Sequence, residues 1–312
     1  MSDSHSHGHL LGPDSQAGRV NRVRLLITIG IVAVVLIVEV IGGILSGSLA
    51  LFADAGHMLS DLTGLLVALV ALTMAARPAT DAQTFGHRRA EVFGALANGL
   101  ILLVVVAVVV VEAITRLLDP VVVSVQAPLM LLVAALGAIA NTAGLLVLRG
   151  GAKDSINMRA AYLEVLGDLV GSMAVIVAAT VILLTGFERA DAIASLAIAA
   201  LIVPRALGLL RDVVRVLSQG TPRGMDVELI REHVLAKPGV VSVHDVHVWS
   251  ITPGSNVFSA HVVVRGAVFS ENRTDWLLDT LTTCLAEHFD VAHSTFQLEP
   301  EEHADHEVEQ HR

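Results

Sequence analysis

Six long apolar runs occupy the first two thirds of this 312-residue sequence. They cover about residues 25–45, 49–75, 92–117, 128–148, 160–185 and 190–210. A helix needs roughly 20 apolar residues to cross a bilayer, and each run is long enough. Hydrophobic residues make up 54% of the chain, above the roughly 45–50% of soluble proteins, and the mean hydropathy is +0.70. The pattern therefore predicts a membrane all-α domain of six transmembrane helices.

The last part of the chain has the pattern of a soluble domain. It predicts helix 226–237, strand 240–251, strand 257–265, helix 270–289 and strand 292–298. This αββαβ order indicates an α+β domain with helices on an antiparallel sheet. Because about 80 residues give only a small core, we also expect dimerisation through this domain. The expected organisation is a disordered histidine-containing tail at 1–21, the six-helix transmembrane domain at 22–218, the soluble domain at 219–300 and a disordered histidine-rich and acidic tail at 301–312.

Basic residues mark one side of the predicted membrane domain. They precede the first run, lie between the second and third and between the fourth and fifth, and close the sixth: Arg19, Arg22, Arg24, Arg77, Arg88, Arg89, Arg149, Lys153, Arg159, Arg205, Arg211 and Arg215. The opposite loops are short and carry little beyond Arg116 and Arg189. Since basic loops stay on the cytoplasmic side, both termini of this multi-pass protein are expected in the cytoplasm.

Composition excludes several classes of function. The net charge of −10 argues against a nucleic-acid partner. The single Cys284 excludes an intrachain disulfide and any cysteine-based zinc cluster, and we expect it to be a buried residue of the soluble domain. No cleavable signal precedes the first run. The sequence contains no nucleophile–base pair, phosphate loop or open catalytic zinc motif, so we do not expect an enzyme.

Two of the apolar runs each carry a pair of metal-ligand side chains. His57 and Asp61 are four residues apart, and Glu164 and Asp168 repeat this spacing. Residues four apart share one face of a helix. An Asp at the centre of a membrane helix costs about 2.5–3.5 kcal/mol, so these pairs need a compensating role. They predict a four-coordinate metal site between the second and fifth helices. The alternative is that each pair only ties helices together, although Ser, Thr, Asn or small residues usually do this.

The chemistry of these four residues suggests both a cargo and a coupling ion. One imidazole and three carboxylates suit Zn²⁺ in a tetrahedron, and Mn²⁺, Fe²⁺ and Co²⁺ accept the same donors. With a neutral histidine the empty site carries three negative charges, so protons are expected to occupy it when metal does not. Because histidine titrates near neutral pH, His57 is the expected proton partner together with a carboxylate. Metal release is then coupled to proton uptake, as in an antiporter.

Other polar residues are weaker candidates. His87 lies in an expected cytoplasmic loop of mixed charge, where a solvated side chain is the alternative to a metal ligand. The soluble domain has a denser set of donors, His244, His247, His261, His293 and Glu299, which either bind cytosolic metal or are scattered surface residues. Histidines in the two tails are open to the same two interpretations. For Glu39, Asn98, Glu112 and Asn141, helix packing is favoured over a place on the ion path, and for Asp54 an interfacial or capping role is at least as favoured as metal contact.

Several spaced motifs resemble the cation diffusion facilitator family, in its zinc and cobalt–zinc–cadmium-resistance branch. Residues 46–51 running into 54–61 resemble the second-helix signature of that family, and residues 85–91 resemble the loop after it. Residues 157–163 lead into the fifth-helix motif, and residues 244–249 resemble the cytoplasmic domain. The resemblance covers about residues 22–299. It implies a homodimeric antiporter that exports a divalent cation from the cytoplasm across the cell membrane by alternating access, with a ferredoxin-like cytoplasmic domain.

At some positions this sequence differs from the usual residues of the family, and one of these differences affects which ion is expected to be transported. The branch usually has His where this chain has Glu164, and a carboxylate there favours harder ions such as Mn²⁺, Fe²⁺ or Co²⁺. His244 and His261 match metal positions of the family and Glu299 an acidic one, whereas Gln83 and Gln297 stand where some members have His. Zn²⁺ remains the first expectation for the transported ion and for the cytoplasmic domain. The rivals are a Mn²⁺, Fe²⁺, Co²⁺ or Cd²⁺ exporter and a membrane-anchored metal sensor.

Overall fold

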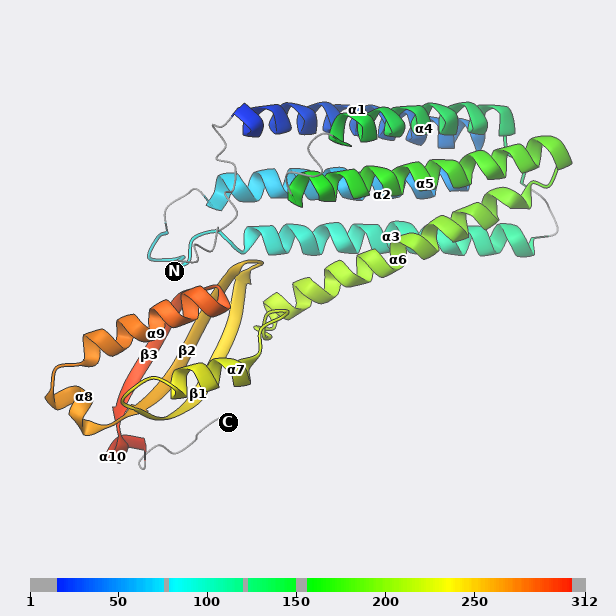
Figure 1. Ribbon diagram of the computed structural model, residues 1–312. Helices are drawn as coiled ribbons and strands as arrows, with labels where there is room; N and C mark the ends of the chain where they lie inside the picture. The colour runs from blue at the N-terminus through cyan, green and yellow to red at the C-terminus, as the bar shows by residue number, and fades with distance from the viewer. Residues whose placement is uncertain (1–15, 76–78, 120–122, 150–155, 305–312) are drawn as a thin grey trace. The chain divides into compact units, whose positions relative to one another are not determined.

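Long helices lie at all six of the predicted apolar runs. The computed structural model describes residues 16–75, 79–119, 123–149 and 156–304 (Figure 1). The helices are α1 Gln16–Ser46, α2 Leu49–Ala75, α3 Ala90–Leu118, α4 Ala127–Arg149, α5 Ile156–Thr185 and α6 Arg189–Leu217. Within the described residues, five of them, α1 and α3 to α6, are long and apolar enough to cross a membrane. The protein is therefore a multi-pass membrane protein.

The chain divides into two compact units. The first comprises residues 1–67 and 97–208, and the second comprises residues 68–96 and 209–312. In the first unit α4 packs against both α1 and α5 (Figure 1). Glycines permit this approach: a Cβ on Gly42 of α1 would lie 2.6 Å from Val133 Cγ2 of α4, and one on Gly144 of α4 would lie 3.3 Å from Val165 Cγ1 of α5. Small residues at helix interfaces are how membrane helices pack closely.

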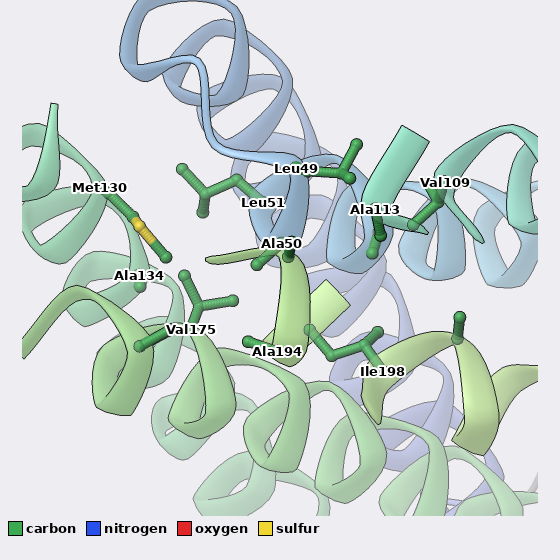
Figure 2. Close-up of a cluster of buried hydrophobic side chains, with 14 of the residues drawn as sticks. Leu49, Ala50, Leu51, Val109, Ala113, Met130, Ala134, Val175, Ala194 and Ile198 are labelled. Atoms are coloured by element: carbon green, nitrogen blue, oxygen red, sulfur yellow. The ribbon is translucent and has the colours of Figure 1, made fainter. Parts of the chain in front are cut away.

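The core of the first unit is built mainly from small side chains. Leu51 of α2, Met130 and Ala134 of α4, Val175 of α5 and Ile198 of α6 belong to one buried cluster (Figure 2). Residues of α3 complete it, so five helices share a single packed interior. This packing fixes the rotation of α2, α5 and α6 about their axes, and hence which polar side chains they turn toward one another.

The second unit contains a three-stranded sheet with helices packed on it. Its elements are α7 Val227–Leu235, β1 Val240–Thr252, β2 Ser255–Val264, α8 Gly266–Ser270, α9 Thr274–Phe289, β3 Val291–Pro300 and α10 Glu301–Ala304. The strand order is β1-β2-β3, with β1 and β2 antiparallel and β2 and β3 parallel. The predicted antiparallel sheet is therefore wrong for the second pair. The physical reason is that α9 crosses back over the sheet before β3 starts, as a parallel connection requires.

Some element boundaries also differ from prediction. The predicted helix 270–289 corresponds to α9, which begins later, at Thr274. The separate short helix α8 ends at Ser270, and between the two helices Asn272 adopts a left-handed conformation with φ of 54°. Helix α1 begins at Gln16, inside the stretch expected as a disordered tail, and Glu301–Ala304 is helical at the other end. The tail histidines His5, His7, His9, His306 and His311 lie outside the described residues.

Candidate metal site and its surroundings

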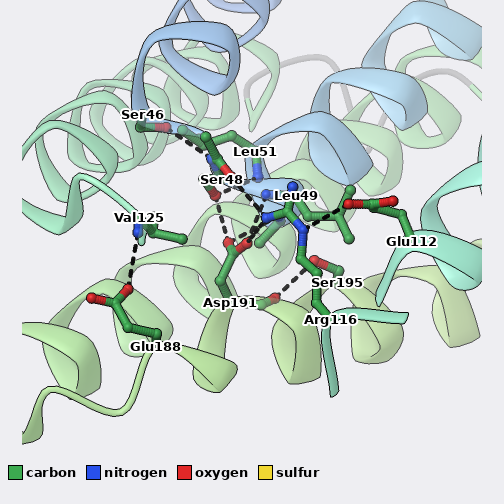
Figure 3. Close-up of polar contacts among 12 residues, drawn as sticks. Ser46, Ser48, Leu49, Leu51, Glu112, Arg116, Val125, Glu188, Asp191 and Ser195 are labelled. Carbon is green, nitrogen blue, oxygen red and sulfur yellow. Dashed lines mark hydrogen bonds and ion pairs between the residues drawn. The ribbon is translucent and has the colours of Figure 1, made fainter. Parts of the chain in front are cut away.

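Two side chains, those of Ser48 and Asp191, bind the first backbone N–H groups of helix α2 and fix where it starts. The Ser48 hydroxyl accepts a hydrogen bond from the Leu51 backbone N–H at 3.2 Å, as an N-cap serine does. Asp191 of α6 then accepts from the Leu49 N–H at 2.7 Å, from the Ala50 N–H at 3.1 Å and from the Ser48 hydroxyl at 2.6 Å (Figure 3). This contact between α2 and α6 was not predicted from the sequence. It holds the helix whose next turns carry the polar residues.

The structure brings His57 and Asp61 of α2 close to Asp168 of α5. The Nε2 atom of His57 lies 3.8 Å from Asp61 Oδ2 and 3.7 Å from Asp168 Oδ1. One ligand atom from each residue lies within 4.8 Å of the others. Two ligands of a tetrahedral Zn²⁺, at about 2.0–2.1 Å from the metal, are about 3.4 Å apart. The two distances from His57 are therefore within a few tenths of an ångström of those around one ion.

Glu164, the fourth predicted ligand, lies beside the trio but does not join it. Its Oε1 atom is 3.1 Å from Nη2 of Arg205 on α6. The same nitrogen is 3.3 Å from Asp61 Oδ1. The guanidinium thus links the carboxylate of α5 to that of α2, across the place where the predicted fourth ligand would meet the other three.

Arg205 is the functional residue that sequence reasoning missed. We interpreted it as one of the basic residues that close the sixth run at its cytoplasmic end, but α6 continues to Leu217 and Arg205 lies well inside the helix. Its Nη1 atom is 3.3 Å from His57 Nε2, and since a guanidinium only donates, His57 accepts with the lone pair that a metal would use. The signal available in the sequence was a charged residue following Pro204 within an apolar run. Its side chain is 44% exposed, so it is not locked in place.

A cavity of about 360 Å³ adjoins this cluster. Helices α2, α5 and α6 line it, and Asp54, His57, Gly167 and Arg205 are among its residues. Asp54 is 1% exposed and accepts a hydrogen bond from the Ser172 hydroxyl at 3.3 Å. It lies inside α2 and caps no helix end, so the capping role considered for it is wrong. The cap belongs to Asp191, because α2 starts five residues before Asp54.

A buried polar network continues from Asp54 toward α1 and α4. Asn141 Nδ2 lies 3.5 Å from Ser172 Oγ. Both Ser172 Oγ and Glu39 Oε1 lie next to Gly137, where a Cβ would come within 3.3 and 2.8 Å of them. Glu39 is fully buried, and within the described part of the chain neither of its carboxylate oxygens has a hydrogen-bond partner. Burying a carboxylate without a hydrogen-bond partner is costly.

The second unit holds the predicted cytoplasmic cluster. His244 of β1, His261 of β2 and Glu299 of β3 each offer a ligand atom within 4.8 Å of the others. Glu299 is 1% exposed, with Oε1 2.8 Å from His261 Nδ1 and Oε2 3.6 Å from His244 Nε2. Gln297, which replaces a possible histidine ligand, donates to Glu299 Oε1 at 2.7 Å. The three neighbouring strands thus gather the donors that the sequence spreads over more than fifty residues.

The remaining candidate metal ligands lie outside these two clusters. His87 is not part of any group of three metal-ligand side chains among the described residues. A further group does occur in the second unit, formed by His233, Cys284 and His288. The prediction that a single cysteine excludes any cysteine-based zinc cluster is too strong, because a mixed site needs only one thiol and the fold supplies two histidines beside it.

Comparison with known proteins agrees with this architecture. Residues 25–218 match the sequence model of the cation efflux transmembrane domain, and residues 222–301 match that of the cation efflux protein cytoplasmic domain. The chain is 40% identical to the zinc transporter ZitB of Escherichia coli, over 96% of this chain and 93% of ZitB. It is 38% identical to the metal cation efflux system protein CzcD of Cupriavidus metallidurans, over 98% of this chain and 93% of CzcD.

Two further similarities are to another relative and to a solved cytoplasmic domain. The cadmium, cobalt and zinc/H⁺–K⁺ antiporter of Bacillus subtilis is 36% identical over 91% of this chain and 90% of that protein. A solved metal-bound C-terminal domain of the CzcD transporter is 39% identical to the chain, covers 24% of it and 99% of that domain, and superposes with a TM-score of 0.22. From the two family models and relatives aligned over almost their whole length, the chain belongs to the cation diffusion facilitator family of metal cation efflux transporters, in its zinc and cobalt–zinc–cadmium branch.

Proposed function

We propose that this protein exports Zn²⁺ from the cytoplasm in exchange for protons, through a site formed by His57, Asp61, Glu164 and Asp168. The observation that supports the proposal most directly is the approach of the imidazole of His57 to the carboxylates of Asp61 and Asp168 on two membrane-domain helices. Three donors at nearly tetrahedral separations, inside a unit of apolar helices, suit a dehydrated divalent cation better than a structural hydrogen bond.

Arg205 gives the site a built-in counter-ion. It offsets one of the three carboxylate charges and holds Glu164 and Asp61 through one guanidinium nitrogen. An entering cation competes with this positive charge for the same oxygens and for the lone pair of His57. We propose that the metal displaces Arg205 toward the cavity, after which Glu164 is free to become the fourth ligand.

Proton coupling follows from the charge that remains when metal leaves. Carboxylates held in a low-dielectric unit cannot all stay ionised without a cation, so protons replace the metal. The buried network of Asp54, Ser172 and Glu39 extends away from His57 and offers further carboxylates to hold these protons. Metal and protons thus compete for overlapping groups, which is the basis of exchange.

The wider organisation completes the proposal. We propose that α2 crosses the cell membrane together with the five apolar helices, and that both termini lie in the cytoplasm. Within the second unit, residues 219–300 are proposed to form a ferredoxin-like domain through which the protein forms a homodimer. The remaining domain boundaries are those expected above, with the six-helix domain at 22–218 and tails at 1–21 and 301–312. His244, His261 and Glu299 are proposed to bind cytosolic Zn²⁺, with Glu299 as the anionic ligand.

Flux through reconstituted vesicles tests the proposal. Purified protein is placed in vesicles with an acidic interior, and uptake of Zn²⁺, Mn²⁺ and Co²⁺ is followed by a trapped indicator. We expect gradient-dependent Zn²⁺ uptake that disappears when a protonophore collapses the gradient. In Asp61→Ala the uptake should fall to the level of empty vesicles, because a ligand and a proton acceptor are both lost. No gradient-driven flux of any metal would rule out the antiporter and favour a metal sensor.

Glu164 offers a test of which ion is carried. A carboxylate hardens the donor set relative to the usual histidine, and this favours Mn²⁺ or Co²⁺ over Zn²⁺. In the same vesicles, Glu164→His is expected to raise the ratio of Zn²⁺ to Mn²⁺ flux. If the wild type carries Mn²⁺ in preference to Zn²⁺, the runner-up function, a manganese, iron or cobalt exporter, replaces zinc export. An unchanged ratio in Glu164→His would show that Glu164 does not contact the cargo.

Arg205→Gln tests the competition between the guanidinium and the cargo. Without the resident cation, the Zn²⁺ concentration for half-maximal flux is expected to fall by about tenfold, which corresponds to only about 1.4 kcal/mol of removed competition. Arg211→Gln is the matched control, because Arg211 is exposed on the same helix and has no part in the cluster. Equal half-saturation values in Arg205→Gln and the wild type would contradict the proposed displacement.

A further inference from the structure

A mixed sulfur and nitrogen cluster lies where α7 packs on α9. His233 is in the last turn of α7, and Cys284 and His288 are one turn apart in the last part of α9. Cys284 is the one cysteine of the chain and is 5% exposed, whereas His288 reaches the surface. One ligand atom of each residue lies within 4.8 Å of the other two. The cluster belongs to the second unit and shares no residue with the His244, His261 and Glu299 cluster.

The distance between Cys284 and His233 is that expected of two metal ligands. Cys284 Sγ lies 3.7 Å from His233 Nδ1. In a tetrahedral site with Zn–S of about 2.3 Å and Zn–N of about 2.0–2.1 Å, sulfur and nitrogen are about 3.6 Å apart. The rings of His233 and His288 have centroids 5.1 Å apart and are tilted by 58°, so they do not stack face to face. Cys284 and His233 could therefore bind one ion with little movement, and His288 has its ligand atom within 4.8 Å of both.

The backbone already orients one of the histidines. His288 Nδ1 lies 3.0 Å from the carbonyl oxygen of Cys284, which can only accept, so Nδ1 carries the proton and Nε2 keeps the lone pair. Metal-binding histidines commonly donate their other ring N–H to a backbone carbonyl in this way, because it fixes the ring and its tautomer. The spacing of four residues between Cys284 and His288 on one helix makes this contact possible.

We propose that His233, Cys284 and His288 bind one thiophilic divalent cation, Zn²⁺ or Cd²⁺, and clamp α7 to α9. The thiolate supplies the soft ligand that the other two clusters lack, so this site should favour Cd²⁺ and Zn²⁺ over Mn²⁺. Three protein ligands leave a fourth position for water on the exposed side of His288. Occupancy stabilises the second unit, because the ion binds the folded helices and not the separated ones. The site is independent of the proposed transport function.

Cobalt substitution tests the site in the full-length protein. The purified chain in detergent micelles is titrated with Co²⁺, and the near-ultraviolet thiolate-to-cobalt charge-transfer band is recorded. Because the chain has a single cysteine, this band can arise only at Cys284. We expect the band in the wild type, its loss in Cys284→Ser, and at least tenfold weaker cobalt binding in His288→Gln. His303→Gln, which changes an exposed histidine of α10 outside the cluster, should leave the band and its midpoint unchanged.

The remaining outcomes distinguish the proposal from simple packing. Added Cd²⁺ should displace cobalt and bleach the band, whereas excess Mn²⁺ should not. Glu299→Gln should keep the band, which separates this cluster from the one on the sheet. If the wild type shows no band at saturating Co²⁺, or if His233→Gln and His288→Gln titrate like the wild type, Cys284 is only a buried apolar residue and the proposal is wrong. Because His288 is exposed, its variant remains informative even if Cys284→Ser does not fold.

Discussion

Replacing Asp168 by asparagine is expected to lower gradient-driven metal flux by at least about 100-fold while leaving the folded protein as stable as the wild type or more so. The side chain is 1% exposed, and its Oδ1 atom has no hydrogen-bond partner in the described part of the chain. An amide of the same shape keeps the packing but is a poor, neutral metal ligand. Loss of a ligand itself should exceed the 10–100-fold effects of changing an outer partner.

Metal flux and thermal stability, measured together, decide the role of Asp168. If the carboxylate served only to join α2 and α5, its loss would remove the contact of α5 with His57 and lower stability. If it binds cargo, removing a buried charge relieves the empty site and only transport suffers. Flux in vesicles and thermal stability in micelles are measured on the same preparations. Asp212→Asn, an exposed carboxylate on α6, is the matched control and should change neither. Normal flux in Asp168→Asn would remove Asp168 from the transport site.

Asp191→Ala is expected to cause the largest loss of stability, about 3–5 kcal/mol, with a fall in melting temperature of about 10 °C. Asp191 is 1% exposed and holds the first backbone N–H groups of α2, which otherwise have no partners at a helix start. Its Oδ2 atom also lies 3.5 Å from Arg116 Nη1. Truncation therefore leaves the start of α2 without its acceptor and removes one of the anionic partners of Arg116 (Figure 3).

Size-exclusion chromatography of heated samples in micelles measures this effect. Asp191→Asn keeps one acceptor oxygen and should lose less than half as much stability as Asp191→Ala. Glu112→Gln is the matched control: Glu112 pairs with the same Arg116 at 3.0 Å but is 47% exposed, and exposed pairs contribute less than about 1 kcal/mol. Equal melting temperatures for Asp191→Ala and Glu112→Gln would show that the cap does not hold α2.

Some features followed directly from the sequence because they depend on local pattern. The apolar runs predicted all six long helices, since a run of apolar residues has few alternatives to a helix in a membrane. The i,i+4 spacing placed His57 and Asp61 on one face of α2, and the αββαβ order of the last part was also evident. The parallel pairing of β2 and β3 was not evident from the sequence, because it depends on where the chain re-enters the sheet after α9.

The sequence by itself determined the family, the membrane helices and most of the candidate ligands, because these reside in composition, short spacings and motifs. Only the tertiary structure decided that Arg205 lies among those ligands, that Asp191 caps α2, and that Cys284 meets two histidines. Apart from the contact of Cys284 with His288, one turn along α9, each of these contacts joins residues dozens of positions apart or more, on different helices. Such contacts depend on the rotation and depth of each helix in the packed bundle or domain, which no periodicity in one segment records.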